Sequence, residues 1–470
     1  MRILSIVFVV FFIVLLILLY MTKTEKHRLG VLLISSYLFY AYADYRFLIL
    51  LFLQTVMVYF IARIIDHKKV AGYSAKAVLA VGVTLNIGIL AIFKYANFFI
   101  SNVLNYWGGA KWDVVLPLGM SFYTFQAISY IVYVYQEKQP LERSFKKVAL
   151  YVGFFPQITS GPIVKARDFF RQLENEHSVK KQNLVEGGQI FLLGLIKKIV
   201  IADRLGRAVD AVYATPKIYS GVSILLVTIA YSIQIYCDFS GYSDMAIGIA
   251  KSLGFDLGKN FNFPYIARNP SEFWQRWHIS LSSWFKEYVY IPLGGSRRGV
   301  ARTCGNLFFV MLLSGVWHGA GWNYIFWGIY HGIGSVLHKL FSGFIKKNNW
   351  SAKTKRGKCI SNAFSILLTF LFVNFGWVIF RSDCLNTAKI ILYRTFTLAD
   401  GVSYIYLYTI IFIVLLSAVA VYIYVKRNGE ATYIFMNYEK TSSWFILGVI
   451  IFGTLMFFYP GESAFIYGKF

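Results

Sequence analysis

Long runs of apolar residues, separated by short polar or basic segments, recur along the whole chain. Several of these runs are short or interrupted by glycine. Crossing a bilayer takes about 20 apolar residues in helical form, so we predict about eleven spanning helices plus re-entrant pieces. The pattern indicates an all-α polytopic membrane protein that forms a single domain over 1–470. Candidate spans lie near 3–21, 29–43, 46–63, 76–93, 115–136, 184–203, 218–237, 241–255, 305–318, 322–343, 359–380, 404–425 and 442–459.

The basic segments between these runs predict the orientation of the chain. Lys and Arg gather near 23–28, 63–76, 346–358 and 426–440. Loops rich in Lys and Arg stay on the cytoplasmic side of a membrane. Counting spans from each loop puts both termini outside, so the tail 460–470 is predicted to be extracytoplasmic.

Two segments depart from the plain pattern of spanning helices. Residues 154–162 are apolar but contain Pro156 and Pro162, which one regular helix cannot hold. A re-entrant bend is expected there. Residues 271–291 place an apolar stripe at helical spacing opposite polar residues, which predicts an amphipathic helix at the membrane interface. The stripe consists of Trp274, Trp277, Leu281, Phe285 and Tyr288.

Composition supports a membrane protein and argues against other classes. Hydrophobic residues make up 57% of the chain and charged residues 15%, against roughly 25% in soluble domains. The net charge of +25 comes from residues that lie between apolar runs, where they would face anionic headgroups, so no nucleic-acid partner is predicted. The four cysteines are widely separated, and we predict no metal site and no bound cofactor.

His318 is the strongest candidate for chemistry. The stretch from Asn306 to His338 contains no Asp, Glu, Lys or Arg. An ionisable residue deep in an apolar run is costly and by default suggests function. Imidazole suits a general base because its pKa lies near operating pH. The alternative is a buried histidine that only bonds between helices.

Other polar residues remain open to two interpretations. His278 flanks the amphipathic stripe at the predicted membrane surface, where it could be an anchor or a catalyst, and Arg276 beside it could meet a phosphate-bearing donor. His331 lies thirteen residues beyond His318, on a different helical face. Asp238 and Asp244 could line a polar cavity or lie in a surface turn, since Ser-Gly-Tyr-Ser between them resembles a turn.

Several motifs, in order over nearly the whole chain, resemble the membrane-bound O-acyltransferase (MBOAT) family, in its bacterial branch of alginate and peptidoglycan O-acetyltransferases. The matching stretches are 117–126 (PLGMSFYTFQ), 155–157 (FPQ) with 161–163 (GPI), 236–244 (YCDFSGYSD), 273–282 (FWQRWHISLS), 290–295 (YIPLGG), 317–320 (WHGA) and 465–467 (FIY).

The resemblance implies a helical bundle around a central tunnel, entered by the donor from the cytoplasm. It implies that His318 is the catalytic histidine and His278 the second, cytoplasm-side histidine. The expected activity is transfer of an acyl group, with acetyl favoured, to hydroxyls of an extracytoplasmic polysaccharide or cell-wall polymer. Candidate contacts with donor or substrate are Arg276, Trp277, Trp317, Asp238 and Asp244.

The resemblance also implies partners and a location. Acetyl-CoA or another acyl thioester is the expected donor, and an extracytoplasmic SGNH-type acetyltransferase is the expected partner. The expected location is the bacterial cytoplasmic (inner) membrane. Two alternatives stay open: D-alanyl transfer to teichoic acid, by enzymes that share the Arg-Trp-His and Trp-His-Gly features, and a polysaccharide or lipid transporter.

The C-terminal tail carries a third candidate catalytic residue. An extended chain gains about 3.3 Å per residue, so the tail could fold back from Pro460 over an outer tunnel mouth. Tyr467 resembles a terminal tyrosine of related acyltransferases that is thought to carry the acyl group. A phenol with a pKa near 10 would need a base such as His318. The alternative is that Tyr467 is an interfacial anchor.

Overall fold

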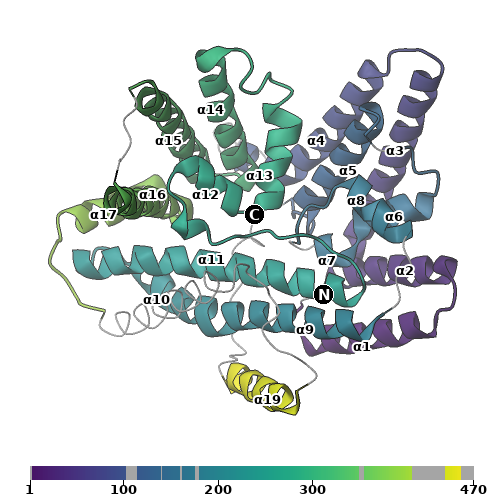
Figure 1. Ribbon diagram of the computed structural model, residues 1–470, viewed down its shortest axis with the longest axis horizontal. Coiled ribbons are helices and arrows are strands. Elements are labelled where there is room, and N and C mark those ends of the chain that lie inside the picture. Colours follow the sequence, from purple (N-terminus) through teal and green to yellow (C-terminus); the bar gives the residue numbers. More distant parts are fainter. Residues whose placement is uncertain are drawn as a thin grey trace. The chain divides into compact units, whose positions relative to one another are not determined.

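The computed structural model describes residues 3–101, 114–138, 140–158, 161–174, 179–348, 354–404 and 440–456 (Figure 1). Within these ranges the chain is helical, and its extended backbone pairs only in an isolated bridge between Tyr219 and Val402. The expected all-α fold is confirmed. The longer helices are α1 (Ile6–Met21), α2 (Glu25–Ala43), α3 (Tyr45–Val70), α4 (Lys76–Phe99), α5 (Met120–Tyr135), α9 (Lys181–Ile196), α10 (Asp203–Ala214), α11 (Gly221–Ser252), α14 (Gly299–His318), α15 (Trp322–Lys347), α16 (Lys355–Arg381), α17 (Leu385–Phe396) and α19 (Thr441–Met456).

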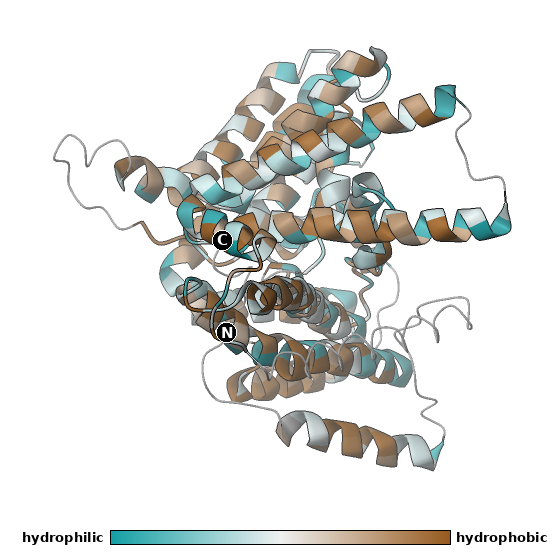
Figure 2. Cartoon of the chain, turned by 90° about the vertical axis from the view of Figure 1, so that its left-hand side faces the viewer, coloured by the Kyte–Doolittle hydropathy of each residue, from teal (hydrophilic) through white to brown (hydrophobic). Residues whose placement is uncertain are grey.

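Five helices of the described ranges are long and apolar enough to cross a bilayer, namely α3, α4, α11, α14 and α16. Figure 2 shows hydrophobic residues running along the long helices, with hydrophilic residues gathered mainly near helix ends. The chain is a multi-pass membrane protein. Some boundaries differ from expectation: α11 is a single helix of 32 residues where the sequence suggested two spans, 218–237 and 241–255. The predicted span 184–203 is divided between α9 and a following π-helix.

The contacts between residues divide the chain into two compact units, whereas the sequence predicts one domain. The first contains residues 1–191 and 245–258, and the second contains residues 192–244 and 259–470. The helices α9 and α11 each contribute residues to both units.

In the first unit, two of the sequence motifs meet. The helix α6 (Phe145–Gly153) ends before the four-residue helix α7 (Phe155–Ile158), so the proline-containing segment is bent as expected. Gly119 has a φ of 68°, and a Cβ there would overlap the carbonyl oxygen of Ile158. Glycine is therefore required where the two motifs touch. The Gln126 side chain also donates to that of Gln157.

In the second unit, three tryptophans form the centre of an aromatic core. Trp277 lies between α12 (Pro270–Arg276) and α13 (Ile279–Phe285), Trp327 on α15, and Trp377 on α16, and each is at most 1% exposed. The ring centroids of Trp277 and Trp377 are 4.9 Å apart, and those of Trp327 and Trp377 are 6.1 Å apart. This core surrounds the candidate site.

The segment 271–291 is not the single amphipathic helix that its pattern predicts. It consists of α12, α13 and the π-helix η5 (Lys286–Tyr290), with a break at Trp277 and His278. The break has a local cause, because His278 adopts left-handed backbone angles, φ 45° and ψ 56°. A right-handed helix cannot continue through such a residue.

Candidate active site

His318 is the last residue of α14, beside a close contact between two helices of the second unit. A Cβ added to Gly315 would lie 2.8 Å from the Cα of Gly328 on α15, and a Cβ on Gly328 would lie 2.8 Å from the Met311 carbonyl oxygen. Such distances are too short for a real side chain. The two glycines therefore bring the backbones of α14 and α15 together one turn before His318.

Aromatic rings surround the His318 side chain, which is 3% exposed. Its ring centroid lies 4.9 Å from that of Trp317, 5.0 Å from that of Trp327 and 5.2 Å from that of Phe380 on α16. The rings contact it nearly edge to face, a favourable geometry for aromatic pairs. Apart from histidines, the sequence from Asn306 to His338 on α14 and α15 carries no acid or base. A neutral imidazole in this position can act as a proton acceptor.

His278 is buried, which corrects the expectation of a surface position. Its side chain is 2% exposed, and its ring lies 4.7 Å from that of Phe239 on α11. The Nδ1 atom lies 3.1 Å from Oδ1 of Asn260, a residue of the loop between α11 and α12. Burial lowers the pKa of His278 to about 3. The imidazole is therefore neutral at pH 7.

Trp317 contacts both candidate histidines. Its ring centroid is 6.3 Å from that of His278 and 4.9 Å from that of His318. Residues from the α12–α13 break and from the end of α14, far apart in the sequence, thus meet around one indole. The aromatic environment excludes water, which strengthens any hydrogen bond or proton transfer within it.

His331 also lies in this aromatic cluster, although its spacing from His318 did not predict that the two would be associated. It is fully buried on α15, and its ring is 4.7 Å from that of Trp327 and 5.1 Å from that of Trp274. Since Trp327 also contacts His318, one indole links the two histidines. They do not form an adjacent pair, as expected.

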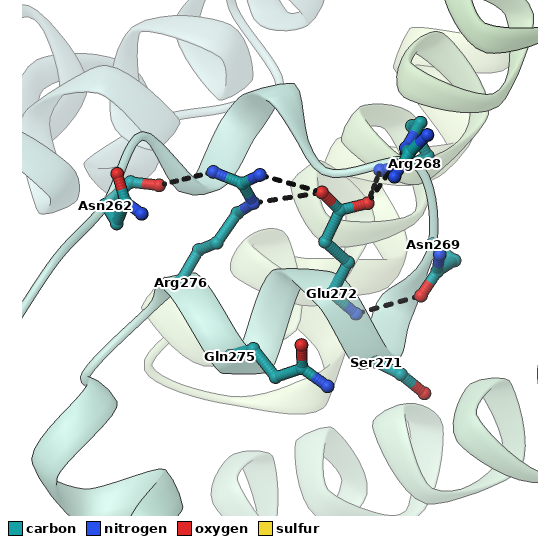
Figure 3. A pocket seen from close by; sticks show the side chains of 7 residues that line it. All are labelled: Asn262, Arg268, Asn269, Ser271, Glu272, Gln275 and Arg276. Atoms are coloured by element: carbon teal, nitrogen blue, oxygen red, sulfur yellow. Dashed lines mark hydrogen bonds and ion pairs between the residues drawn. The ribbon is translucent and has the colours of Figure 1, made fainter. Parts of the chain in front are cut away.

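The motif residues at the end of α12 and directly after it divide between a core and a pocket. Trp277 packs into the aromatic core and is 1% exposed. Arg276 instead borders an open polar pocket of about 460 Å³ (Figure 3). The pocket is lined by Asn262, Arg268, Asn269, Ser271, Glu272, Gln275 and Arg276.

Glu272 organises the polar pocket. Its carboxylate accepts from Nη2 of Arg276 at 2.9 Å and from Nε of Arg268 at 3.2 Å, as the dashed lines in Figure 3 show. Arg276 also donates through Nη1 to the backbone carbonyl of Asn262 at 3.1 Å. Partial burial raises the pKa of Glu272, but hydrogen bonds from the two arginines outweigh it and the pKa is lowered. The carboxylate therefore stays ionised and holds both guanidinium groups in place.

Asp238 and Asp244 lie inside α11 rather than in a turn, so the surface-turn alternative is wrong. Asp238 Oδ1 lies 2.6 Å from Nζ of Lys198, and Asp244 Oδ2 lies 2.6 Å from Nζ of Lys197. All four side chains are buried to a large extent. Both lysines begin the π-helix η3 (Lys197–Ala202). The acids are thus buried partners in ion pairs.

Gly241 explains why Ser-Gly-Tyr-Ser continues the helix. A Cβ there would lie 2.7 Å from the carbonyl oxygen of Gly194 and 3.1 Å from Cβ of Lys197. The glycine allows close approach between α11 and the α9–η3 segment, with one acid three residues before it and the other three residues after it. The two ion pairs therefore lie on either side of this contact.

Three of these residues were not identified from the sequence. The sequence could have marked Lys197 and Lys198 as members of buried ion pairs, because paired lysines within the apolar run 184–203 need buried partners. Nothing in the sequence marks Asn260 as a functional residue, since an asparagine in a polar loop is common. Tyr467 lies outside the described residues. Within the described ranges, no three His, Cys, Asp or Glu side chains converge as a metal site would require.

Comparison with known proteins identifies the family. Residues 34–378 match the family described as MBOAT, membrane-bound O-acyltransferase family. The chain belongs to this family and is an O-acyltransferase.

Among its relatives is the probable alginate O-acetylase AlgI of Pseudomonas syringae pv. tomato, 40% identical over 79% of this chain and 70% of the relative. The peptidoglycan O-acetyltransferase of Helicobacter pylori is 35% identical over 76% of this chain and 71% of the relative. The teichoic acid D-alanyltransferase of Bacillus subtilis is 30% identical over 57% of this chain and 69% of the relative.

Proposed function

We propose that this protein moves an acetyl group from a cytoplasmic thioester donor, such as acetyl-CoA, across a bacterial cytoplasmic membrane. The final acceptors are hydroxyls of an extracytoplasmic polysaccharide or cell-wall polymer. The observation that carries the proposal is His318, a buried imidazole among aromatic rings in a member of an O-acyltransferase family. The relatives named for alginate and peptidoglycan support a polymer as the acceptor.

In this reaction His318 acts as the general base. It takes the proton of the attacking hydroxyl as the oxygen forms a bond to the thioester carbonyl carbon. The carbon–sulfur bond then breaks, and the proton passes to the departing thiolate. Positioning and general-base catalysis together contribute several orders of magnitude in rate. His278, neutral and beside Trp317, accepts a hydrogen bond from the donor.

The proposal extends to the handover on the outer side. The hydroxyl of Tyr467 receives the acetyl group and passes it, as an activated aryl ester, to an SGNH-type partner that acetylates the polymer. Tyr467→Phe keeps the ring and removes only the nucleophile. Polymer acetylation at the normal rate in this variant would make Tyr467 an anchor and remove the relay from the proposal.

The central experiment is His318→Ala in the full chain in its native membrane. Ester-linked acetate is released from the isolated polymer by mild alkali and quantified. Loss of acetate is expected while the protein accumulates normally. His338→Ala is the matched control, since His338 is half-exposed near the end of α15. Normal acetylation by His318→Ala would refute the role of His318.

The same alkaline extract tests D-alanyl transfer, which the D-alanyltransferase relative makes a second candidate. Release of D-alanine in place of acetate would identify that activity. The same variant tests the transporter alternative. Transport would be favoured if His318→Ala still moves polymer or lipid across the membrane and if polymer acylation does not require this protein.

A further inference from the structure

Asn260 lies where the chain folds back along the α12–α13 break. The side chain is fully buried, although it belongs to the loop that follows α11. Its backbone carbonyl accepts from the N–H of Ile279 at 2.8 Å. Asn260 therefore contacts the backbone directly after His278 as well as the His278 ring.

The hydrogen bonds of Asn260 identify which amide atom faces His278. The Oδ1 atom accepts from the Ser280 hydroxyl at 2.9 Å and from the Ser280 N–H at 3.3 Å. The Nδ2 atom donates to the Ser243 hydroxyl oxygen at 3.0 Å. The atom that lies 3.1 Å from Nδ1 of His278 is therefore an oxygen, which can only accept.

We infer that Asn260 is a positioning residue that holds His278 in the Nδ1–H tautomer and leaves Nε2 as the basic nitrogen of the ring. Nδ1 must carry the proton because it faces an acceptor. In a neutral imidazole the other nitrogen then carries the lone pair. The role of this lone pair in acyl transfer rests on the proposed function, in which Nε2 accepts a hydrogen bond from the acyl donor.

The contacts that the structure describes around His278 agree with this assignment. On α11, which contacts His278 through Phe239, the charged groups Asp238 and Asp244 are already paired with lysines. On the α14 side, Trp317 approaches and the sequence from Asn306 to His338 carries no acid or base other than histidines. Asn260 in turn is held by Ser243 of α11. The hydrogen bonds thus connect Ser243 of α11, through the Asn260 amide, to the imidazole of His278.

Two substitutions at Asn260 separate orientation of the ring from simple packing. Asn260→Leu removes the acceptor. Asn260→Asp keeps an acceptor facing Nδ1, and the Ser243 hydroxyl can turn and donate to the new carboxylate. Asn348→Leu is the control for the same chemical change, because Asn348 is exposed at the end of α15.

The first readout reports the tautomer and does not depend on acyl transfer. The full-length protein, labelled with ¹⁵N-histidine, is compared with His278→Gln to assign the His278 signals. We expect a protonated Nδ1 and an unprotonated Nε2 in the wild type and in Asn260→Asp, and a mixture of tautomers in Asn260→Leu. A wild-type His278 that carries its proton on Nε2 would overturn the inference.

The second readout is the kinetics of acetyl transfer. Asn260→Leu should lower kcat by about 10- to 100-fold, the range found when partners that orient a functional histidine are removed. Asn260→Asp should restore most of the rate and move the acid limb of the pH–rate profile upward, because a carboxylate raises the pKa of its imidazole neighbour. Equal losses in both variants, with unchanged spectra, would reduce Asn260 to a packing residue.

The two readouts also separate this inference from the proposed function. If the wild type transfers neither acetyl nor D-alanyl groups, the proposed function fails, and the spectra still decide the tautomer. If the wild type is active but Asn260→Leu retains full activity, a single tautomer is not needed and the positioning role is wrong.

Discussion

Two apolar helices hold buried ionisable groups within the second unit, and they do so in opposite ways. On α11, Asp238 and Asp244 each lie 2.6 Å from a lysine. At the end of α14, His318 is enclosed by rings of α14, α15 and α16. The buried ion pairs of the two acids with the lysines hold α11 and η3 together. His318 instead contacts neutral aromatic rings from three helices.

The contrast also separates the expected effects of mutations. Removing one partner of a buried ion pair leaves an uncompensated charge and costs about 3–5 kcal/mol. Removing the His318 imidazole leaves no stranded charge, so its cost to folding is smaller. Substitutions in α11 should therefore reduce the amount of folded protein, whereas substitution of His318 should remove activity from protein that still folds.

Lys198→Met should have the largest effect on stability. Lys198 is 2.6 Å from Asp238 and 2.8 Å from Asp203, so two acids lose their partner. We expect a large fall in membrane accumulation and a loss of several kcal/mol in the free energy of unfolding. Thermal unfolding of the purified protein measures the loss of stability. Lys339→Met, on the exposed face of α15, is the control.

Restoration by a second substitution sharpens this prediction. Adding Asp238→Leu to Lys198→Met removes the most deeply buried stranded charge and should recover much of the lost stability. Normal accumulation of the single variant would show that these ion pairs do not hold α11 in place.

His278→Gln should have an intermediate effect that depends on pH. The unfolded chain protonates His278 near pH 6.5, whereas the folded chain does so only near pH 3. The unfolded state therefore binds more protons between these values, and stability falls as the pH is lowered from about 6.5 towards 3. Glutamine does not titrate, so the variant should lose part of this slope in thermal unfolding. Identical slopes would mean that His278 does not titrate as a buried group.

Arg276→Lys should have the smallest effect on stability, below about 1 kcal/mol, because its partner Glu272 lies at a partly exposed pocket. If Arg276 contacts a phosphate-bearing donor, KM for the donor should rise several-fold at unchanged kcat, since lysine lacks the planar fork of arginine. Arg268→Lys, which shares Glu272, is the matched comparison. An unchanged KM in both would exclude donor binding at this pocket.

Local patterns predicted the parts of the molecule that depend on neighbours in sequence. The apolar runs predicted the helices, and the absence of charge around His318 made it a candidate, which the structure places among aromatic rings. The Ser-Gly-Tyr-Ser segment misled, because Gly241 serves a close approach to Gly194 rather than a turn. A glycine in a single sequence does not reveal which of these two roles it has.

The break at His278 could not be predicted for a related reason. No glycine or proline marks it, and the bonds that hold it come from Asn260, eighteen residues earlier. A helical stripe of five apolar residues continues across the break, so periodicity favoured one helix. Only the tertiary contacts of a buried loop determine where that helix stops.

If His278 assists acyl transfer as proposed, its left-handed backbone sets selection for stability against selection for catalysis at this position. A non-glycine residue held at φ 45° costs on the order of 1–3 kcal/mol of folding energy. Glycine there would remove the strain, and asparagine would tolerate it better than most residues, but either would remove the imidazole. Sequences selected only for robust folding should therefore drift away from histidine at 278, and those that must transfer an acyl group should retain it.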